Sequence, residues 1–384
     1  MVDDAVDAGA RSGMQRVPMS SFRSIAGEWD ALADAIGAPP WSRPGWIEIW
    51  ARRFGGRPVA IVLRRDGTLR AVAPVTRGRL SGVVAAANRH TPRYVVLAAD
   101  ADSEAALVRG LVEQEGSLRI SHMHQAVADR LWRMLDMSGG RASVRTLGES
   151  PYIDLSASTW AAYRRTISNR ARSIERELRR LGRRHGPVTV VDIRAGDEFD
   201  RYVDVGLELE GSGWKRRDGT AIVSQRETAM FYRELCRWAA RRGFLRLSFL
   251  CAGRRAIAFD LSLESSGVVS TLKGGYDPRY RSYGPGVMLT YETVRRLFEE
   301  RAARYELLGQ PEAFKQSFTS AGDEQAMLYA AAAGARGLVG VAAFASQLGL
   351  RAHIKPIGAP LVRRYRRLRF GGGYSAGGRY EIAS

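Results

Sequence analysis

The chain has 384 residues, enough for two domains with ample cores, and its apolar content of 45% is ordinary for a globular protein. Its formal net charge of +19 suits acidic partners such as nucleotide phosphates, nucleic acid or anionic lipid headgroups. The two cysteines, Cys236 and Cys251, imply no disulfide framework, and the first residues contain no apolar signal core. We therefore expect a cytoplasmic protein.

The positive charge is unevenly distributed. Only 4 of the 59 basic residues are lysine, which leaves 55 arginines and indicates a coding bias, so each lysine is more informative than each arginine. Residues 159–185 contain nine arginines and two glutamates, and residues 351–370 contain six arginines and one lysine without an acid. Each stretch is either a solvated face or a docking surface for an acidic partner.

The first part of the chain begins with a tail, 1–16, that is expected to be disordered. Two helices are predicted over 21–54, followed by a hairpin in "PVAIVLRRDGTLRAVAPVTR", where two apolar runs flank Asp66-Gly67. Short strands and helices continue to "SPYIDL", so we expect a first domain over 17–156. His122-Met-His124 has a metal-ligand spacing, but no acidic or cysteine cluster supports it, and we predict no metal site.

Residues 159–185 carry one continuous apolar stripe at helical spacing, from Trp160 to Leu181. Arginine fills the other faces, and "HGP" ends the pattern. We predict a single amphipathic helix here, either a connector with a solvated basic face or a binding helix.

The next segments alternate in a definite order. Strands are predicted at 188–193, 245–251, 255–264, 268–274, 304–309 and in "EQAMLYAA". Helices are predicted on either side of "GSGWKRRDGT", in the stretch that begins at Gly284, and over 335–352. An antiparallel meander followed by a strand–helix–strand crossover predicts a mixed sheet with helices on both faces. The apolar run at 326–350 approaches membrane-spanning length, but Arg336 and Gln347 interrupt it, so a strand, a turn and a buried helix are expected.

The stretch "RYRSYGPGVMLTYETVRRLFEE" predicts a helix with a glycine-rich start. Gly284 suits the N-cap, and Pro285 suits the first helical position, where its missing N–H has no intrahelical partner. Helix N-termini attract phosphates through free N–H groups and the helix dipole. The stretch is therefore either a phosphate site or simply a helix start.

The order of these elements and four motifs resembles the GNAT acyltransferase superfamily. The motifs are "SNRARSIERELRRL", "GWKRRDGTAI", "LKGGYDPRYRSYGPGVML" and "YELLGQPEAFKQSF", within residues 160–350. More narrowly, they look like the acetyltransferase domain of cellulose or exopolysaccharide biosynthesis proteins, related to Fem-like aminoacyltransferases. The resemblance implies an α/β fold of tandem GNAT-like domains, each a mixed, mostly antiparallel sheet flanked by helices. The second domain would span 157–350, and a basic segment and tail 351–384.

The resemblance also implies a donor site. Arg281-Ser-Tyr-Gly284-Pro-Gly286 matches the family's R/Q-x-x-G-x-G/A loop, whose helix holds the pyrophosphate of acyl-CoA. Arg281, Gly284, Gly286 and Val287 would then bind acyl-CoA, most simply acetyl-CoA, as co-substrate without a metal. Pro285 departs from a typical loop because it removes one N–H donor, which the Arg281 side chain would have to replace.

Transfer of this kind needs a base for the amine, oxyanion donors and an acid for the thiolate. Glu306, on a predicted strand, is either the base or a solvent-facing residue. Asp260, within "AIAFDLSLE", needs a partner if buried, and a Tyr283 hydroxyl beside the donor loop is a candidate acid. Neither cysteine has a convincing histidine partner, so we predict no covalent nucleophile.

The expected acceptor site combines an aromatic ring with cations and a carboxylate. Trp214 would stack on a sugar or nucleotide and Lys215 would pair with an anion, whereas the alternative for any single lysine is surface solubility. The remaining candidates for this site are Glu210, Lys273, Tyr276 and Lys315.

These residues and the resemblance together imply an acyltransferase that uses acyl-CoA and an amine, or a hydroxyl, on a small-molecule or saccharide acceptor, with a role in polysaccharide or envelope metabolism. One alternative is a Fem-like enzyme using aminoacyl-tRNA, with the helix at 159–185 on RNA phosphates. The other is a non-catalytic accessory protein of polysaccharide synthesis. The basic segment after 350 either packs on the second domain or lies on the anionic inner face of the membrane, which would make the protein peripheral there.

Overall fold

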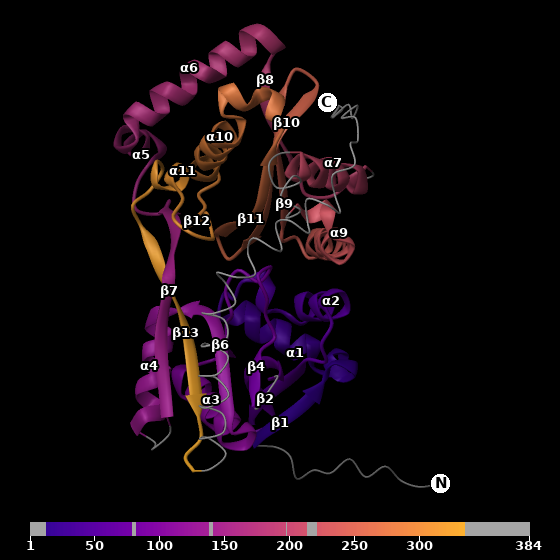
Figure 1. The fold of residues 1–384 in the computed structure, drawn as a ribbon, viewed down its shortest axis with the longest axis vertical. Helices are drawn as coiled ribbons and strands as arrows, with labels where there is room; N and C mark the ends of the chain where they lie inside the picture. The colour runs from indigo at the N-terminus through magenta and orange to yellow at the C-terminus, as the bar shows by residue number, and fades with distance from the viewer. Residues whose placement is uncertain (1–12, 79–81, 138–140, 197, 213–220, 335–384) are drawn as a thin grey trace, which may run out of the picture. The chain divides into compact units, whose positions relative to one another are not determined.

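The structure, a computed structural model, describes residues 13–334 except 79–81, 138–140, 197 and 213–220 (Figure 1). The described residues divide into two compact units: the first runs to Gly148 and resumes at Glu324, and the second is Glu149–Asp323. The helix expected over 335–352 and the basic segment 351–384 lie outside the described residues. Within those residues, no helix combines the length and apolarity that a membrane crossing requires.

The first unit contains the helices and the hairpin that the sequence predicts. Its helices are α1 (Phe22–Ala35), α2 (Pro44–Phe54), α3 (Ala101–Glu115) and α4 (Gln125–Met137), with 3-10 turns at Met19–Ser21 and Pro40–Ser42. Its strands are β1 (Gly13–Pro18), β2 (Val59–Arg65), β3 (Thr68–Arg77), β4 (Val83–Ala85), β5 (Leu97–Ala98) and β6 (Ser117–His124). Asp66 and Gly67 both have positive φ, as the tight turn between β2 and β3 requires.

The sheet of the first unit is built in the order β1-β2-β3-β4-β6-β13, with β5 on β3. Here β13 (Gly322–Ala331) is the strand expected in "EQAMLYAA", and β7 (Arg141–Asp154) follows it in the order. The chain passes between the units within β7 and within β13. The sequence predicts β13 as part of the second domain. The strand instead completes the sheet of the first unit, where Ala326, Leu328 and Ala330 are core residues.

The second unit contains the predicted meander and crossover. Its helices are α5 (Trp160–Thr166), α6 (Ser168–His185), α7 (Phe199–Gly211), α9 (Arg226–Arg241), α10 (Pro285–Glu299) and α11 (Ala313–Gln316), with 3-10 turns η3 (Ile222–Ser224) and η4 (Pro278–Tyr283). Its strands are β8 (Val188–Ile193), β9 (Leu245–Ala252), β10 (Arg255–Ser265), β11 (Val268–Tyr276) and β12 (Arg304–Glu306). They lie in the order β7-β12-β11-β10-β9-β8.

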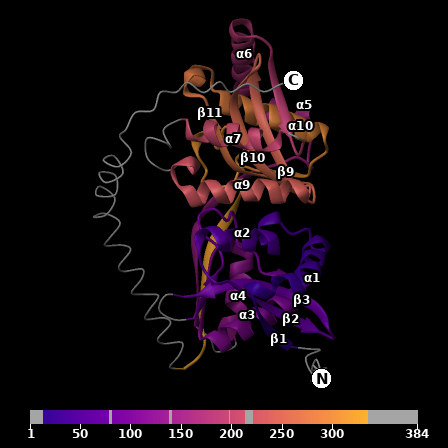
Figure 2. The same ribbon diagram turned by 90° about the vertical axis from the view of Figure 1, so that its right-hand side faces the viewer.

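Two helical layers cover this sheet. The helices α5, α6 and α10 lie on one face, and α7 and α9 lie on the other (Figures 1 and 2). On the α10 face, Met288, Leu289, Val294 and Leu297 pack with the strand residues Leu250 and Val269. On the α7 face, Gly206 allows α7 to approach Phe259, because a Cβ at this glycine would lie only 2.4 Å from the ring.

The helix predicted over 159–185 is divided in two. Thr159 caps α5 by accepting a hydrogen bond from the Ala162 N–H, and Ile167 has φ −103° and ψ 26°, which ends α5 before α6 begins. The expectation of one continuous helix was therefore wrong. An ion pair between Arg164 of α5 and Glu175 of α6, with N–O distances of 2.8 and 2.6 Å, connects the two pieces across the break.

Both units follow the same order of elements. Apart from the short strand β5 between β4 and α3, the first has β1-α1-α2-β2-β3-β4-α3-β6, and the second has β8-α7-α9-β9-β10-β11-α10-β12. In each unit the last helix of this series connects two parallel neighbours, β4 with β6 and β11 with β12. The expected tandem of mixed, mostly antiparallel sheets flanked by helices is confirmed.

Candidate active site in the second unit

The most open part of the second sheet lies where β11 and β12 separate. The two strands pair in parallel only from Val268–Arg304 to Ser270–Glu306. Beyond this point β11 continues to Tyr276, whereas β12 ends, because Leu308 and Gly309 both have positive φ. The strand expected over 304–309 is thus shorter than predicted. Among the described residues, no strand pairs with the outer edge of β11 from Thr271 onward, so the sheet is open there.

A β-bulge helps to separate the strands. On the β10 side, Leu261 is opposite Lys273 while Ser262 is opposite Thr271, so Leu272 is an extra residue in β11. A bulge bends its strand and increases its twist. The part of β11 after the bulge is therefore turned away from β12 and leads directly into η4 and α10.

The start of α10 has the geometry that the sequence predicts. Gly284 is the N-cap in the left-handed region, with φ 72° and ψ 50°, and Pro285 is the first helical residue. No side chain caps this end of the helix. A Cβ at Gly286 would meet only Tyr276 Cδ1, at 3.7 Å, so the backbone here is accessible to a ligand. The free N–H groups and the helix dipole favour an anion at this position.

The surroundings of this helix start are basic and aromatic. Arg281 is exposed, and Val287 is half-buried against the core. Tyr283 is largely buried, its hydroxyl lies 3.4 Å from His185 Nε2, and the guanidinium of Arg180 lies 4.5 Å from its ring centre. Tyr283 thus connects the donor loop to α6, and the role of acid for the thiolate stays a prediction.

The two candidate carboxylates point to opposite faces of the sheet. Tyr305 packs in the core under α10, so its neighbour Glu306 faces the α7 side, because side chains alternate along a strand. Phe259 faces Gly206 of α7, so Asp260 faces the α10 side. The structure therefore places Asp260 with the donor loop and Glu306 on the other face.

Glu306 is a buried carboxylate at the point where the strands part. Only 6% of the residue is exposed, so the solvent-facing alternative was wrong. Its Oε2 accepts a 2.8 Å hydrogen bond from the Ser270 hydroxyl, and Arg304 Nε lies 3.6 Å from Oε1. A buried carboxylate fixed by two partners and adjacent to an open strand edge is a suitable proton acceptor.

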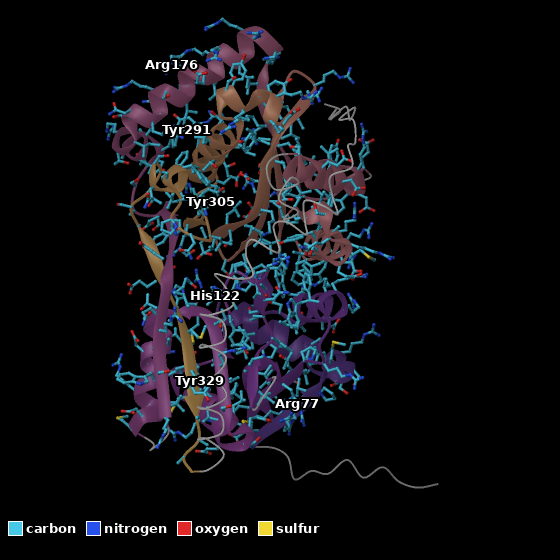
Figure 3. The ribbon with its side chains drawn as sticks, viewed as in Figure 1. Arg77, His122, Arg176, Tyr291, Tyr305 and Tyr329 are labelled. Atoms are coloured by element: carbon cyan, nitrogen blue, oxygen red, sulfur yellow. The ribbon has the colours of Figure 1, made fainter. Side chains whose placement is uncertain are left out.

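Asp260 is half-buried beside two residues that the sequence did not single out. Its Oδ1 would lie 2.2 Å from a Cβ at Gly274, the residue opposite it on β11. The Thr271 hydroxyl donates a 2.8 Å hydrogen bond to the Tyr305 hydroxyl (Figure 3). Burial, and secondarily the charge of Asp260, raises the pKa of Tyr305, so this phenol stays protonated.

The expected acceptor residues are only partly brought together. Glu210 is buried at the end of α7, and its Oε2 accepts a 2.8 Å hydrogen bond from the Ile222 N–H. The Tyr276 carbonyl accepts a 2.8 Å hydrogen bond from the Ser212 hydroxyl, and Lys273 Nζ lies 5.7 Å from the centre of the Tyr232 ring. Lys273 and Glu210 thus lie on the α7 face. Trp214 and Lys215 lie outside the described residues.

Lys315 is not a surface lysine. Its Nζ donates hydrogen bonds of 2.6 Å to Leu308 O and 3.1 Å to Gln310 O, and it lies 3.5 Å from a Glu312 oxygen. Burial lowers its pKa. Lys315 therefore fixes the turn that follows β12 and ends the strand, while acceptor binding by its ammonium stays a prediction.

The corresponding helix start in the first unit is unsuited to a diphosphate. Asp100 caps α3 by accepting a 2.7 Å hydrogen bond from the Ser103 N–H, and Asp102 and Glu104 follow in the first turn. This hydrogen bond, with others from Ser103 and Arg70, lowers the pKa of Asp100 to about 2. A carboxylate thus occupies the position where the second unit leaves the helix end free, and the first unit lacks a matching donor loop at α3.

Other reactive groups are remote from this chemistry. Burial raises the pKa of Cys236 to about 12 and that of Cys251 to about 11, so both thiols stay protonated. His122 has a positive φ at a bulge in β6, and burial lowers its pKa. No group of metal-ligating side chains occurs among residues 13–334 where the structure describes them.

Comparisons with known proteins support this assignment of the fold. Residues 168–316 match the family model "Acetyltransferase (GNAT) domain". The structure of FemX is similar, with a TM-score of 0.58 and 12% identity, over 79% of this chain and 95% of that one. The C-terminal domain of a putative lysylphosphatidylglycerol synthetase from Agrobacterium fabrum has a TM-score of 0.51 and 14% identity, over 79% and 91%. No curated protein matches the sequence. The chain has a GNAT-superfamily, Fem-like fold with an acetyltransferase-type domain in its second unit.

Proposed function

We propose that the second unit transfers an acyl group from acyl-CoA to an amine, or to a hydroxyl, of a small-molecule or saccharide acceptor. The observation that carries this proposal is the separation of β11 and β12 beside an uncapped helix start. In this proposal the diphosphate binds at Gly284, Gly286 and Val287 with help from Arg281, and the acyl chain lies along the free edge of β11.

The two faces of the sheet would then have different tasks. The donor lies on the α10 face, and the acceptor approaches from the α7 face, where Lys273 and Glu210 lie. Glu306 takes the proton of the attacking amine as the N–C bond forms and the C–S bond breaks, and the thiolate leaves and is protonated. Backbone N–H groups of β11 beside the strand separation stabilise the oxyanion. Asp260 lies on the donor face, which suits positioning better than deprotonation of the acceptor.

Binding of the donor tests this proposal directly. Isothermal titration of the full chain with CoA, acetyl-CoA and longer acyl-CoAs should give saturable binding. Gly286→Glu, which puts a carboxylate at the helix start, should abolish it. Arg241→Ala is a matched control, because Arg241 is exposed at the end of α9. Equal CoA binding by Gly286→Glu and the parent would show that the loop is only a helix start.

A second candidate function is aminoacyl transfer from tRNA, as in Fem-like enzymes. Two features favour it. The first is a row of exposed arginines on α6, where the spacing of 4, 3 and 4 residues puts four side chains on one face: Arg172, Arg176, Arg179 and Arg183. Pro285 also leaves the donor loop one N–H short. Steeply salt-dependent tRNA binding without a response to CoA would support this candidate. A role in envelope polysaccharide metabolism, at the inner face of the membrane, is likewise a proposal.

A further inference from the structure

A groove of about 640 Å³ lies in the second unit between α6, β8 and α10. It is separate from the proposed base Glu306, because β8 is the last strand of the sheet and β12 is four strands away, roughly 19 Å at the usual strand spacing. Its walls carry Glu175 and Arg179 from α6, and Tyr291, Glu292 and Arg295 from α10.

Two guanidinium groups are available to a ligand in this groove, one from each wall. Arg179 is exposed, and its charge, after the hydrogen bond from Arg164, is among the causes that lower the pKa of Glu175 in the same groove. Arg295 pairs with Glu292 at 2.7 Å, but the arginine side chain is 43% exposed, and such surface pairs are weak and exchangeable. Arg296, in contrast, is held by Asp192 and by the Val190 carbonyl.

The groove also offers fixed acceptors and ring surfaces. The Glu175 carboxylate accepts hydrogen bonds from Arg164 and, at 2.6 Å, from the Tyr291 hydroxyl, which fixes its position and leaves further acceptor sites on its oxygens. Glu292 provides a second carboxylate. Trp160 stands edge-on to Tyr291, with ring centres 5.2 Å apart, and Val188 and Leu250 add apolar surface.

This combination selects one chemical class of ligand. A phosphodiester chain carries at most one free hydroxyl per unit to donate to the two carboxylates, and a purely apolar ligand would desolvate the two arginines without compensation. A sugar acid uses all the groups: its carboxylate pairs with guanidinium, its hydroxyls donate to Glu175 and Glu292, and its C–H face packs on an aromatic ring. We propose that the groove binds a hexuronate unit of an acidic carbohydrate chain. This binding does not depend on the acyl transfer proposed above.

The outward face of α6 extends the site. Arg172, Arg176 and Arg183 continue the row that contains Arg179, at axial steps of about 4.5–6 Å along the helix. Arg176 is labelled on α6 in Figure 3. A chain that carries repeated carboxylates can therefore follow α6 beyond the groove. The apolar stripe of α6 is packed in the core through Ala171, Ile174 and Leu181, so this helix has no apolar face left to insert into a lipid layer.

The experiment is a titration of the full chain with hexagalacturonate, with maltohexaose as the neutral probe and a six-nucleotide RNA as the phosphate probe. The parent should bind hexagalacturonate, and Arg179→Ala and Arg295→Ala should each weaken this binding about tenfold or more, as the loss of a charged hydrogen bond predicts. Arg241→Ala should bind like the parent. Because Arg179 is exposed and the Arg295 side chain is 43% exposed, thermal unfolding of these variants should match that of the parent.

Three results would overturn the proposal. Absence of hexagalacturonate binding would exclude it, and equal binding of maltohexaose would show that charge is not recognised. Tighter binding of the RNA than of hexagalacturonate, lost in the same variants, would assign the groove to nucleic acid instead.

Discussion

The contact between Gly275 of β11 and the end of α7 is the tightest backbone approach at the candidate site. A Cβ at Gly275 would lie 2.4 Å from Glu210 Cα, 2.6 Å from Glu210 N and 2.7 Å from Leu209 O. Ordinary contacts begin at 3.4 Å, so the shortest distance is too small by 3.4 − 2.4 = 1.0 Å. Gly275→Ala therefore forces β11 and α7 apart.

The expected loss of stability follows from the atoms that block the methyl group. Overpacking of a core costs about 1–3 kcal/mol and sometimes more, and the blocking atoms here are backbone, which cannot rotate away. For a unit of this size, 1 kcal/mol corresponds to roughly 2–4 °C in Tm. At the upper value of about 3 kcal/mol, we expect Gly275→Ala to lower the Tm of the second unit by roughly 6–12 °C.

Thermal unfolding of the full chain, followed by circular dichroism, measures this effect. Gly182→Ala in α6 is the matched control, because its Cβ would meet only Val188 Cγ2, at an ordinary 3.8 Å. Its Tm should stay the same or rise slightly, since alanine is the better helix former. If Gly275→Ala unfolds within about 1 °C of the parent, α7 does not press on β11 as described.

Four further predictions concern the site and its surroundings. Glu306→Gln should lower kcat for acyl transfer about 10²–10⁴-fold, measured by release of the CoA thiol, and an unchanged rate would remove Glu306 as the base. Arg281→Ala should weaken CoA binding roughly 10- to 150-fold in calorimetry, the equivalent of about 1.5–3 kcal/mol; a smaller change would mean that the guanidinium does not touch the diphosphate. Cys236 and Cys251 should resist an aromatic disulfide reagent at pH 8 in the folded protein and react in urea, since burial raises the pKa of both thiols; rapid labelling without urea would contradict their burial. Burial opposes ionisation of Asp192, but Arg246 and Ser248 outweigh it and lower its pKa in the folded protein. The contribution of Asp192 to the free energy of unfolding is therefore complete above the unfolded pKa of 3.8, and it is lost as the pH falls through the lower pKa of the folded state. Asp192→Asn should lower the free energy of unfolding by about 1–3 kcal/mol at pH 7. Urea unfolding should also show that this free energy changes less with pH below 3.8 than in the parent; an unaltered pH dependence would exclude Asp192 as its source.

Local patterns predicted most of the second unit. Alternation in "VTVVDI" gave β8 with its exact bounds, and Gly284-Pro285 located the start of α10. These features depend on neighbouring residues, which the sequence contains directly. The break at Ile167 escaped prediction because the apolar stripe continues across it, and only the backbone geometry interrupts the helix.

The burial of the candidate side chains could not be predicted from local sequence patterns. Alternation alone could not decide the face of Asp260 or the exposure of Glu306, since both depend on which helices cover the sheet. Ser270, Thr271 and Tyr305 were missed because a serine or a tyrosine in a strand carries no signal of its own; their partners come from other strands. The pairing of β13 with β6 in the first unit was missed for the same reason, because it joins residues far apart in the sequence.

The crossing of the chain within β7 and β13 has a consequence for synthesis on the ribosome. In the first sheet, β13 lies between β6 and β7, yet it is translated after every other described strand of both units. Until it emerges, β6 presents an open edge, which is a template for wrong pairing with other chains. The first unit therefore cannot finish folding before the second unit has been translated, and a nascent chain that stops before β13 should be a substrate for chaperones rather than a folded domain.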